Sequence, residues 1–161
     1  MPSKSGSSAV YRMANDQDVE KIFNLISPFS KKNILLPRSK EGIIADLPLT
    51  WVVADNNKLL ATACLIEYQE DLYEIRAFAV DLHYQRSGIG KKLIEFILTD
   101  FKKQNTRSDI RIFAFTYVPE FFMKLGMLPV EKDKFPKKIF DDCQYCFKIN
   151  DCHEVAMQRN L

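Results

Sequence analysis

The sequence predicts a single α/β domain with a mixed sheet, and three observations support this prediction. The chain has 161 residues, which is enough to bury one sizeable core and too few to build two independent ones. Hydrophobic residues make up 47% of it and charged residues 27%, a composition typical of a chain that folds by itself. Between residues 72 and 115 the order strand, glycine-containing loop, helix, strand indicates a crossover between parallel strands.

The N-terminus is expected to be flexible, because residues 1–8 are small and polar and no apolar run follows them. This segment resembles neither a signal peptide nor a membrane span, so we expect a cytoplasmic chain with one folded domain over residues 9–161. The net charge of +2 provides no strong field for nucleic acid or a membrane surface. We therefore expect a small-molecule partner, no nucleic acid and no membrane, and the sequence leaves a homodimer open.

A short strand is predicted at residues 10–13, and two helices follow it. Asn15 or Asp16 is suited to cap the first helix, and Pro28 is expected to end it. Ser39 is suited to cap the second helix, which we expect Pro48 to end. The positions predicted to be buried are Val19, Ile22, Phe23 and Ile26 in the first helix, and Ile43, Ile44 and Leu47 in the second.

The middle of the chain predicts a β-hairpin and a buried strand. Apolar segments at 51–54 and 59–66 flank the turn-forming residues Asp-Asn-Asn at 55–57. Residues 72–80 are apolar at nearly every position, as expected of a strand that is covered on both faces. Two charges within this strand need an explanation.

The surest helix begins at Ile89, because apolar residues then recur with helical spacing and lysines occupy the other side. Residues 110–115 form the next predicted strand, which we expect to be the parallel neighbour of 72–80. Pro119 suits the first turn of a short helix that ends at Gly126.

The loop at residues 85–90, Gln-Arg-Ser-Gly-Ile-Gly, is a candidate anion site. Gly88 and Gly90 allow backbone amides to approach a ligand, and the helix that follows directs unpaired N–H groups and a positive dipole end toward it. Two glycines alone are more typical of a simple turn into a helix. The spacing matches neither a Walker A loop nor the three-glycine dinucleotide fingerprint.

In its context, however, the loop resembles the signature of GNAT acetyltransferases: Gln or Arg, two residues, Gly, one residue, Gly or Ala, placed between a strand and a helix. The resemblance implies the GNAT fold, a mixed and mostly antiparallel sheet with helices on both faces that is splayed at the acetyl-CoA site. It implies acetyl-CoA as co-substrate and no required metal. The cofactor-binding residues that it implies are Phe78, Ala79, Val80, Gln85, Arg86, Ser87, Gly88, Ile89, Gly90 and Lys91.

Several further segments resemble the short bacterial N-acetylglutamate synthases of arginine biosynthesis, which transfer acetyl from acetyl-CoA to the α-amino group of L-glutamate. These segments are residues 35–39, 71–76, 118–122, 125–126 and 154–157. Such an enzyme needs cations to receive the two carboxylates of glutamate. Arg76 and Arg38 are the candidates, although Arg76 is equally suited to pair with a nearby acid and Arg38 to be a solvated loop residue.

Proton transfer is assigned to Glu74 and Tyr117. An amine must lose a proton before it attacks a thioester, and Glu74 lies eleven residues before Gln85, a spacing that resembles the general base of histone-type GNAT enzymes. Strand alternation places Glu74 on the same face as Arg76 and Phe78, so a Glu74–Arg76 ion pair is the alternative interpretation. Many GNAT enzymes carry an acid tyrosine where this chain has Phe122, which leaves Tyr117, water or no acid at all.

Two further interpretations remain open from the sequence. Cys143, Cys146, Cys152 and His153 have half of a zinc-site spacing, and we expect free thiols there in preference to a metal. The rival functions are a GNAT enzyme for another small amine or amino acid, and a regulatory module that binds acetyl-CoA without turnover. Cys64 is expected to be a small core residue.

Overall fold

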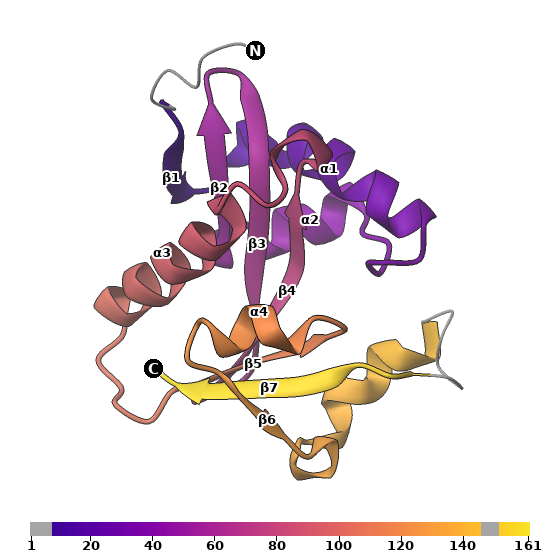
Figure 1. The fold of residues 1–161 in the computed structure, drawn as a ribbon, viewed down its shortest axis with the longest axis vertical. Coiled ribbons are helices and arrows are strands. Elements are labelled where there is room, and N and C mark those ends of the chain that lie inside the picture. Colours follow the sequence, from indigo (N-terminus) through magenta and orange to yellow (C-terminus); the bar gives the residue numbers. More distant parts are fainter. Residues whose placement is uncertain (1–7, 146–151) are drawn as a thin grey trace.

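A seven-stranded mixed sheet forms the centre of the computed structural model, which describes residues 8–145 and 152–161 (Figure 1). The strands are β1 (Val10–Met13), β2 (Thr50–Asp55), β3 (Lys58–Gln69), β4 (Leu72–Val80), β5 (Arg111–Thr116), β6 (Leu128–Val130) and β7 (Val155–Asn160). Their spatial order is β1-β2-β3-β4-β5-β7-β6. Of the pairings in the described ranges, only β4 with β5 is parallel, which confirms the predicted mixed and mostly antiparallel sheet.

Helices cover both faces of the sheet, as predicted. They are α1 (Val19–Lys31), α2 (Lys40–Asp46), α3 (Ile89–Gln104) and α4 (Pro119–Met123). The helices α1 and α2 pack on one face, and α3 and α4 on the other (Figure 1). No helix among the described residues is long and apolar enough to cross a membrane. Residues 1–7 of the expected flexible N-terminus lie outside the described residues.

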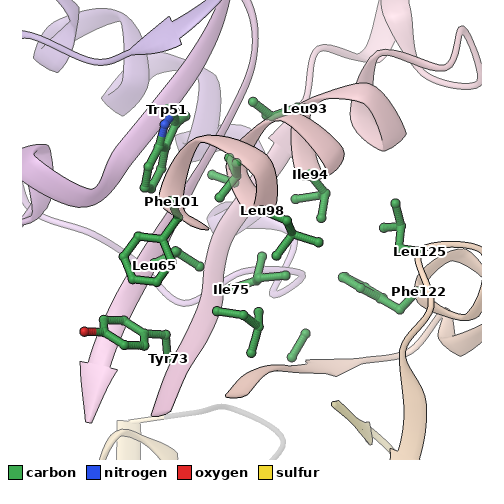
Figure 2. Packing of buried hydrophobic residues seen from close by; sticks show 14 of the residues in the cluster. Trp51, Leu65, Tyr73, Ile75, Leu93, Ile94, Leu98, Phe101, Phe122 and Leu125 are labelled. Atoms are coloured by element: carbon green, nitrogen blue, oxygen red, sulfur yellow. The ribbon is translucent and has the colours of Figure 1, made fainter. Parts of the chain in front are cut away.

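The main core lies between α3 and the sheet. Leu93, Ile94, Leu98 and Phe101 of α3 point toward Trp51, Leu65, Tyr73 and Ile75 on the strands, and Phe122 and Leu125 close the cluster from the α4 side (Figure 2). The indole of Trp51 is fully buried, and its N–H donates to the Asp100 carboxylate on α3 at 2.8 Å. Burial of an apolar helix stripe is the main stabilising term in such a layer. This core holds the N-terminal end of α3 against β4.

Two details of the predicted helices are wrong. The helix α1 continues through Pro28 to Lys31, because Pro28 lies on the exposed side of the helix while Ile22 and Ile26 anchor the buried side. In α2, Ile43 is buried as expected, but Ile44 is 53% exposed, since it lies about 100° around the helix axis from the buried stripe. Ser39 caps α2 by accepting from the Gly42 N–H at 3.0 Å, as predicted.

An extra residue in β4 changes which face its side chains take. On β3 the register advances by two residues from Thr62 to Cys64, while on β4 it moves by three, from Ala79 to Arg76. The irregularity includes Ala77, whose φ is +52°. It is a β-bulge, which breaks the alternation of a regular strand. Glu74 and Phe78 therefore lie on opposite faces, and the prediction that they share one is wrong.

The β4 and β5 strands separate soon after they pair. Their ladder joins Leu72, Tyr73 and Glu74 only to residues 111–113, although both strands continue beyond it. Beyond Glu74 the described part of β4 keeps its antiparallel partner β3 but has no ladder with β5. The splay predicted from the resemblance is thus present.

The bulge provides a test of the strand geometry. Ala77→Gly should change the free energy of unfolding by less than about 1 kcal/mol, because glycine adopts a positive φ freely but orders at a higher entropic cost. Ala77→Val should cost about 2–4 kcal/mol, since a β-branched residue is strained at this φ and the site is only 9% exposed. Urea denaturation measures both values, and equal losses would show that the fold does not impose the positive φ.

Candidate active site

The loop before α3 is shaped as an anion cradle. Gly88 is the N-cap of the helix with a φ of +86°, and Arg86 has a φ of +61°. The Lys92 N–H donates to the Gly88 carbonyl at 3.1 Å, which makes it the start of the helical hydrogen-bond series. The N–H groups before Lys92 therefore have no acceptor within the helix and point toward the helix end. Together with the helix dipole they favour a bound anion such as a phosphate.

The two glycines of the loop have different roles. A Cβ atom added at Gly88 would meet no atom within 4 Å, so the space beside it is open to a ligand. A Cβ atom at Gly90 would lie 3.0 Å from the Phe78 ring and 3.2 Å from Val80. Gly90 therefore serves close packing of the helix on β4, while Gly88 serves the left-handed backbone.

Most of the predicted cofactor residues gather at this place. Phe78 and Val80 lie beneath the start of α3, and the Phe78 ring is 5.5 Å from that of Phe121 on α4. The Gln85 side-chain amide donates to the Val80 carbonyl at 3.2 Å, and the Ser87 hydroxyl donates to the Tyr84 carbonyl. The exception is the Ala79 side chain, which packs in the cluster on the opposite face with α1 and α2. Only the backbone of Ala79 follows the predicted cofactor strand.

The α1–α2 face of β4 carries the predicted catalytic and substrate charges. The Tyr68 hydroxyl donates to Oε2 of Glu74 at 2.8 Å, and the Arg76 guanidinium donates to the Tyr68 oxygen at 2.7 Å. A direct ion pair of 2.9 Å joins Arg76 to the same Oε2 atom. The predicted Glu74–Arg76 pair thus exists, and Tyr68 is a third member that sequence reasoning missed. The strand predicted at 59–66 stopped short of Tyr68, whereas β3 continues to Gln69 and brings Tyr68 beside Glu74.

The carboxyl group of Glu74 is buried, which changes its acidity. The residue is 6% exposed, and desolvation raises the pKa of its carboxyl above the ordinary value of 4.5. The charge of Arg76 and hydrogen bonds from Tyr68 and Arg76 lower the pKa, while the charge of Glu154 raises it further. The net direction is upward, which makes the carboxylate a stronger base than an exposed glutamate.

Arg38 is not a solvated loop residue. Its side chain is 14% exposed. The guanidinium forms an ion pair with Asp46 and donates to the Gly42 carbonyl at 3.2 Å and to the Cys64 sulfur at 3.5 Å. Burial raises the pKa of Cys64 to about 11, so the thiol is neutral and donates to the Arg76 carbonyl at 3.4 Å. Cys64 therefore connects Arg38 to the backbone of Arg76. The two predicted substrate residues lie on the same face of the sheet.

A pocket opens beside Arg38 at the end of α1. It encloses about 400 Å³ including open solvent, and its walls come from α1, the loop that follows and α2. A smaller hollow that Arg38 also lines reaches Cys64 and Ala77 on the sheet. Arg38 thus lies between an open pocket and the strands that carry the Glu74 network.

The candidate acid Tyr117 is partly exposed, whereas Phe122 is buried. Tyr117 lies between β5 and α4 and is 45% exposed, at the end of the strand that separates from β4. Phe122, in the place where many GNAT enzymes have an acid tyrosine, is buried in the core at 5% exposure. In the late cysteine group, Cys146 lies outside the described residues. Within residues 8–145 and 152–161, no three His, Cys, Asp or Glu side chains are grouped to hold a metal ion.

The splayed strands, the anion cradle at the start of α3 and the charges on the opposite face define the class of this protein. A model of the acetyltransferase (GNAT) family matches residues 16–127. The chain belongs to this family, and the resemblance of its sequence to GNAT acetyltransferases is confirmed.

Two curated proteins and one solved structure are similar to this chain. An uncharacterized N-acetyltransferase of Chlorobaculum tepidum is 29% identical over 93% of this chain and 95% of its own length. The amino-acid acetyltransferase of Proteus mirabilis is 31% identical over 78% of this chain and 28% of its own. The N-acetylglutamate synthase of Neisseria gonorrhoeae, complexed with coenzyme A and N-acetyl-glutamate, has a TM-score of 0.80 at 26% identity over 95% of this chain. The chain spans about a third of the length of the last two proteins.

The raised pKa of Glu74 predicts a pH dependence of stability. A raised pKa means that the native state holds the proton more tightly than the unfolded chain, so this contribution is complete below pH 4.5 and is lost as the pH rises through the native pKa. Glu74→Gln cannot ionise, and its free energy of unfolding should rise relative to that of the wild type across this window.

Urea denaturation at several pH values between 4.5 and neutrality checks this expectation. Glu67→Gln, which removes one negative charge from an exposed position on the neighbouring strand, is the matched control. If the wild type instead gained stability over Glu74→Gln as the pH rose, the ion pair with Arg76 would outweigh desolvation.

Proposed function

We propose that this protein transfers the acetyl group of acetyl-CoA to the α-amino group of L-glutamate. The observation that carries the proposal is the separation of two binding regions by β4. An anion cradle lies on the α3 face, and Arg38, Arg76 and Glu74 lie on the α1–α2 face. The likeness to an N-acetylglutamate synthase complexed with coenzyme A and N-acetyl-glutamate supports this assignment. A cytoplasmic role in arginine biosynthesis belongs to the same proposal.

Acetyl-CoA is assigned to the gap where β4 leaves β5. Its pyrophosphate accepts from the backbone N–H groups of residues 86–90 at the start of α3. Its pantetheine arm follows the free edge of β4 near Phe78 and Val80, where that edge has no ladder with β5. The thioester then reaches the level of the bulge at Ala77, where the alternation of side chains between the two faces of β4 is broken.

The chemistry needs one proton acceptor and one leaving group. The α-ammonium of glutamate gives a proton to the Glu74 carboxylate, and the neutral nitrogen attacks the thioester carbonyl carbon. The tetrahedral intermediate collapses with cleavage of the carbon–sulfur bond while the attacking nitrogen loses its second proton to water, which releases the neutral amide of N-acetyl-glutamate and the coenzyme A thiolate. Tyr117 is the candidate to protonate the thiolate, although a thiolate is stable enough to leave without an acid.

The acceptor carboxylates are assigned to Arg38 and Arg76. Arg38 borders the pocket between α1 and α2, and Arg76 lies beside the base. Each arginine already has a carboxylate partner, Asp46 and Glu74 respectively. A substrate carboxylate therefore joins or replaces an existing charge-assisted contact, which favours an anionic acceptor over a cationic one.

The donor site is tested at Gly88. Gly88→Glu should weaken acetyl-CoA binding by roughly 100-fold or more, because a negative side chain would meet the pyrophosphate and like charges in contact cost several kcal/mol. Gly88→Ala is the matched control, since it carries the same backbone strain without the charge. Isothermal titration calorimetry on both folded variants measures the effect, and unchanged affinity in Gly88→Glu would show that acetyl-CoA binds elsewhere.

The acceptor site is tested with a panel of L-glutamate, L-glutamine, L-leucine and L-lysine. We expect kcat/KM for L-glutamate to exceed that for the others, and Arg76→Ala to raise its KM by roughly 10- to 150-fold through loss of a charged hydrogen bond of about 1.5–3 kcal/mol. Release of free coenzyme A thiol measures the rates, with Arg76→Lys as the charge-conserving control.

Other outcomes of the panel point to the rival functions. A preference for lysine or leucine would refute glutamate as the acceptor and leave the family assignment intact. Acetyl-CoA binding without turnover of any acceptor would favour a regulatory module.

A further inference from the structure

Tyr68 lies at a second irregularity in the pairing of β3 with β4. The register pairs Ile66 with Glu74 and Glu67 with Tyr73, but the next pair is Gln69 with Leu72. Tyr68 is thus the extra residue of a bulge on β3, while Ala77 belongs to the bulge on β4. Bulges re-aim side chains and are frequent next to active sites. The two irregularities lie on either side of the Glu74 and Arg76 positions.

The hydroxyl of Tyr68 lies between opposite charges. It donates to Oε2 of Glu74 at 2.8 Å and accepts from Arg76 at 2.7 Å, while Arg76 contacts the same carboxylate oxygen at 2.9 Å. The three groups form a closed triangle, in which each distance is that of a normal or charge-assisted hydrogen bond. A phenylalanine at position 68 would keep the ring and remove two of the three contacts.

Other elements hold Tyr68 in this position. Its ring lies 5.9 Å from that of Phe113 on β5, in a tilted arrangement. The Lys138 ammonium, from the 3-10 segment Lys137–Tyr145, donates to the backbone carbonyl of Tyr68. The side chain is therefore fixed from β5 and its backbone from the C-terminal part of the chain, so the hydroxyl is set before any substrate binds.

We propose that Tyr68 is a positioning residue of the acetyl transfer, whose hydroxyl holds the Glu74 carboxylate beside Arg76 and keeps it ionised for proton acceptance. This inference rests on the proposed role of Glu74 as base. The ionised carboxylate loses most of its hydration on burial, and a donor hydroxyl replaces part of it. Without the hydroxyl, the carboxylate would keep only Arg76 as a contact of the triangle and would take up a proton at higher pH.

The charged surroundings of Glu74 agree with this role. Arg76 on β4 and Tyr68 on β3 favour the ionised carboxylate, and Glu154, just before β7, opposes it. From β5 the partner of Glu74 is Phe113, which carries no charge. Tyr68 therefore acts with Arg76 against the effects of burial and of Glu154.

Tyr68→Phe tests the inference through the pH profile of kcat/KM with L-glutamate and acetyl-CoA. The acid limb should move upward by about one to two pH units, the loss expected for one hydrogen bond to a charged group. At pH values below the limb the rate should fall roughly 10- to 100-fold, and on the alkaline plateau it should recover. Tyr73→Phe is the matched control, because Tyr73 points to the opposite, α3 face of β4.

A direct titration keeps the test independent of turnover. The ¹³C shift of the Glu74 carboxyl, assigned by comparison with Glu74→Gln, should titrate at higher pH in Tyr68→Phe than in the wild type. An acid limb that disappears in Glu74→Gln but stays in place in Tyr68→Phe would overturn the role of Tyr68 and leave the base standing. A limb that persists in Glu74→Gln would overturn the base and, with it, the role of Tyr68 in positioning the base.

Discussion

The extra residue at Ala77 is the constraint on which the site depends. A regular strand would place Glu74, Arg76 and Phe78 on one face, whereas the bulge sends Phe78 and Val80 to the α3 face and leaves the charges on the other. One strand can then contact a cofactor from one side and an acceptor from the other. The positive φ of Ala77 is a local strain that the antiparallel pairing with β3 on both sides of the bulge maintains.

The charges on the α1–α2 face are arranged in pairs. Arg38 lies with Asp46 and Arg76 with Glu74, while the Cys64 thiol links the two sets. Buried ion pairs contribute little net stability, because desolvation offsets most of their attraction. Their position on one face of the sheet agrees with the proposed role of these charges in binding the acceptor. The raised pKa of Glu74 shows that desolvation exceeds the stabilising contacts at this carboxylate.

Close packing of α3 on β4 joins the cofactor loop to this strand. Gly90 lets the helix approach to within contact of Phe78 and Val80, and the α3 core holds the helix there. The N–H groups at the helix start are thus fixed relative to the bulge, and through it relative to Glu74. Such rigid placement is what a transfer between two bound molecules requires, since small displacements of reacting groups cost large factors in rate.

Hydrophobic periodicity, glycine placement and capping residues were enough to predict the helix at Ile89, the glycine loop before it, the hairpin and the parallel crossover, because these features depend on neighbours in sequence. The same patterns led to wrong predictions at Pro28, Ile44 and Phe78, where exposure or register decided the outcome. Only the tertiary structure placed Tyr68 against Glu74 and joined Arg38 to Cys64. Strand register and the position of a bulge arise from packing of several elements at once, and no local pattern encodes them.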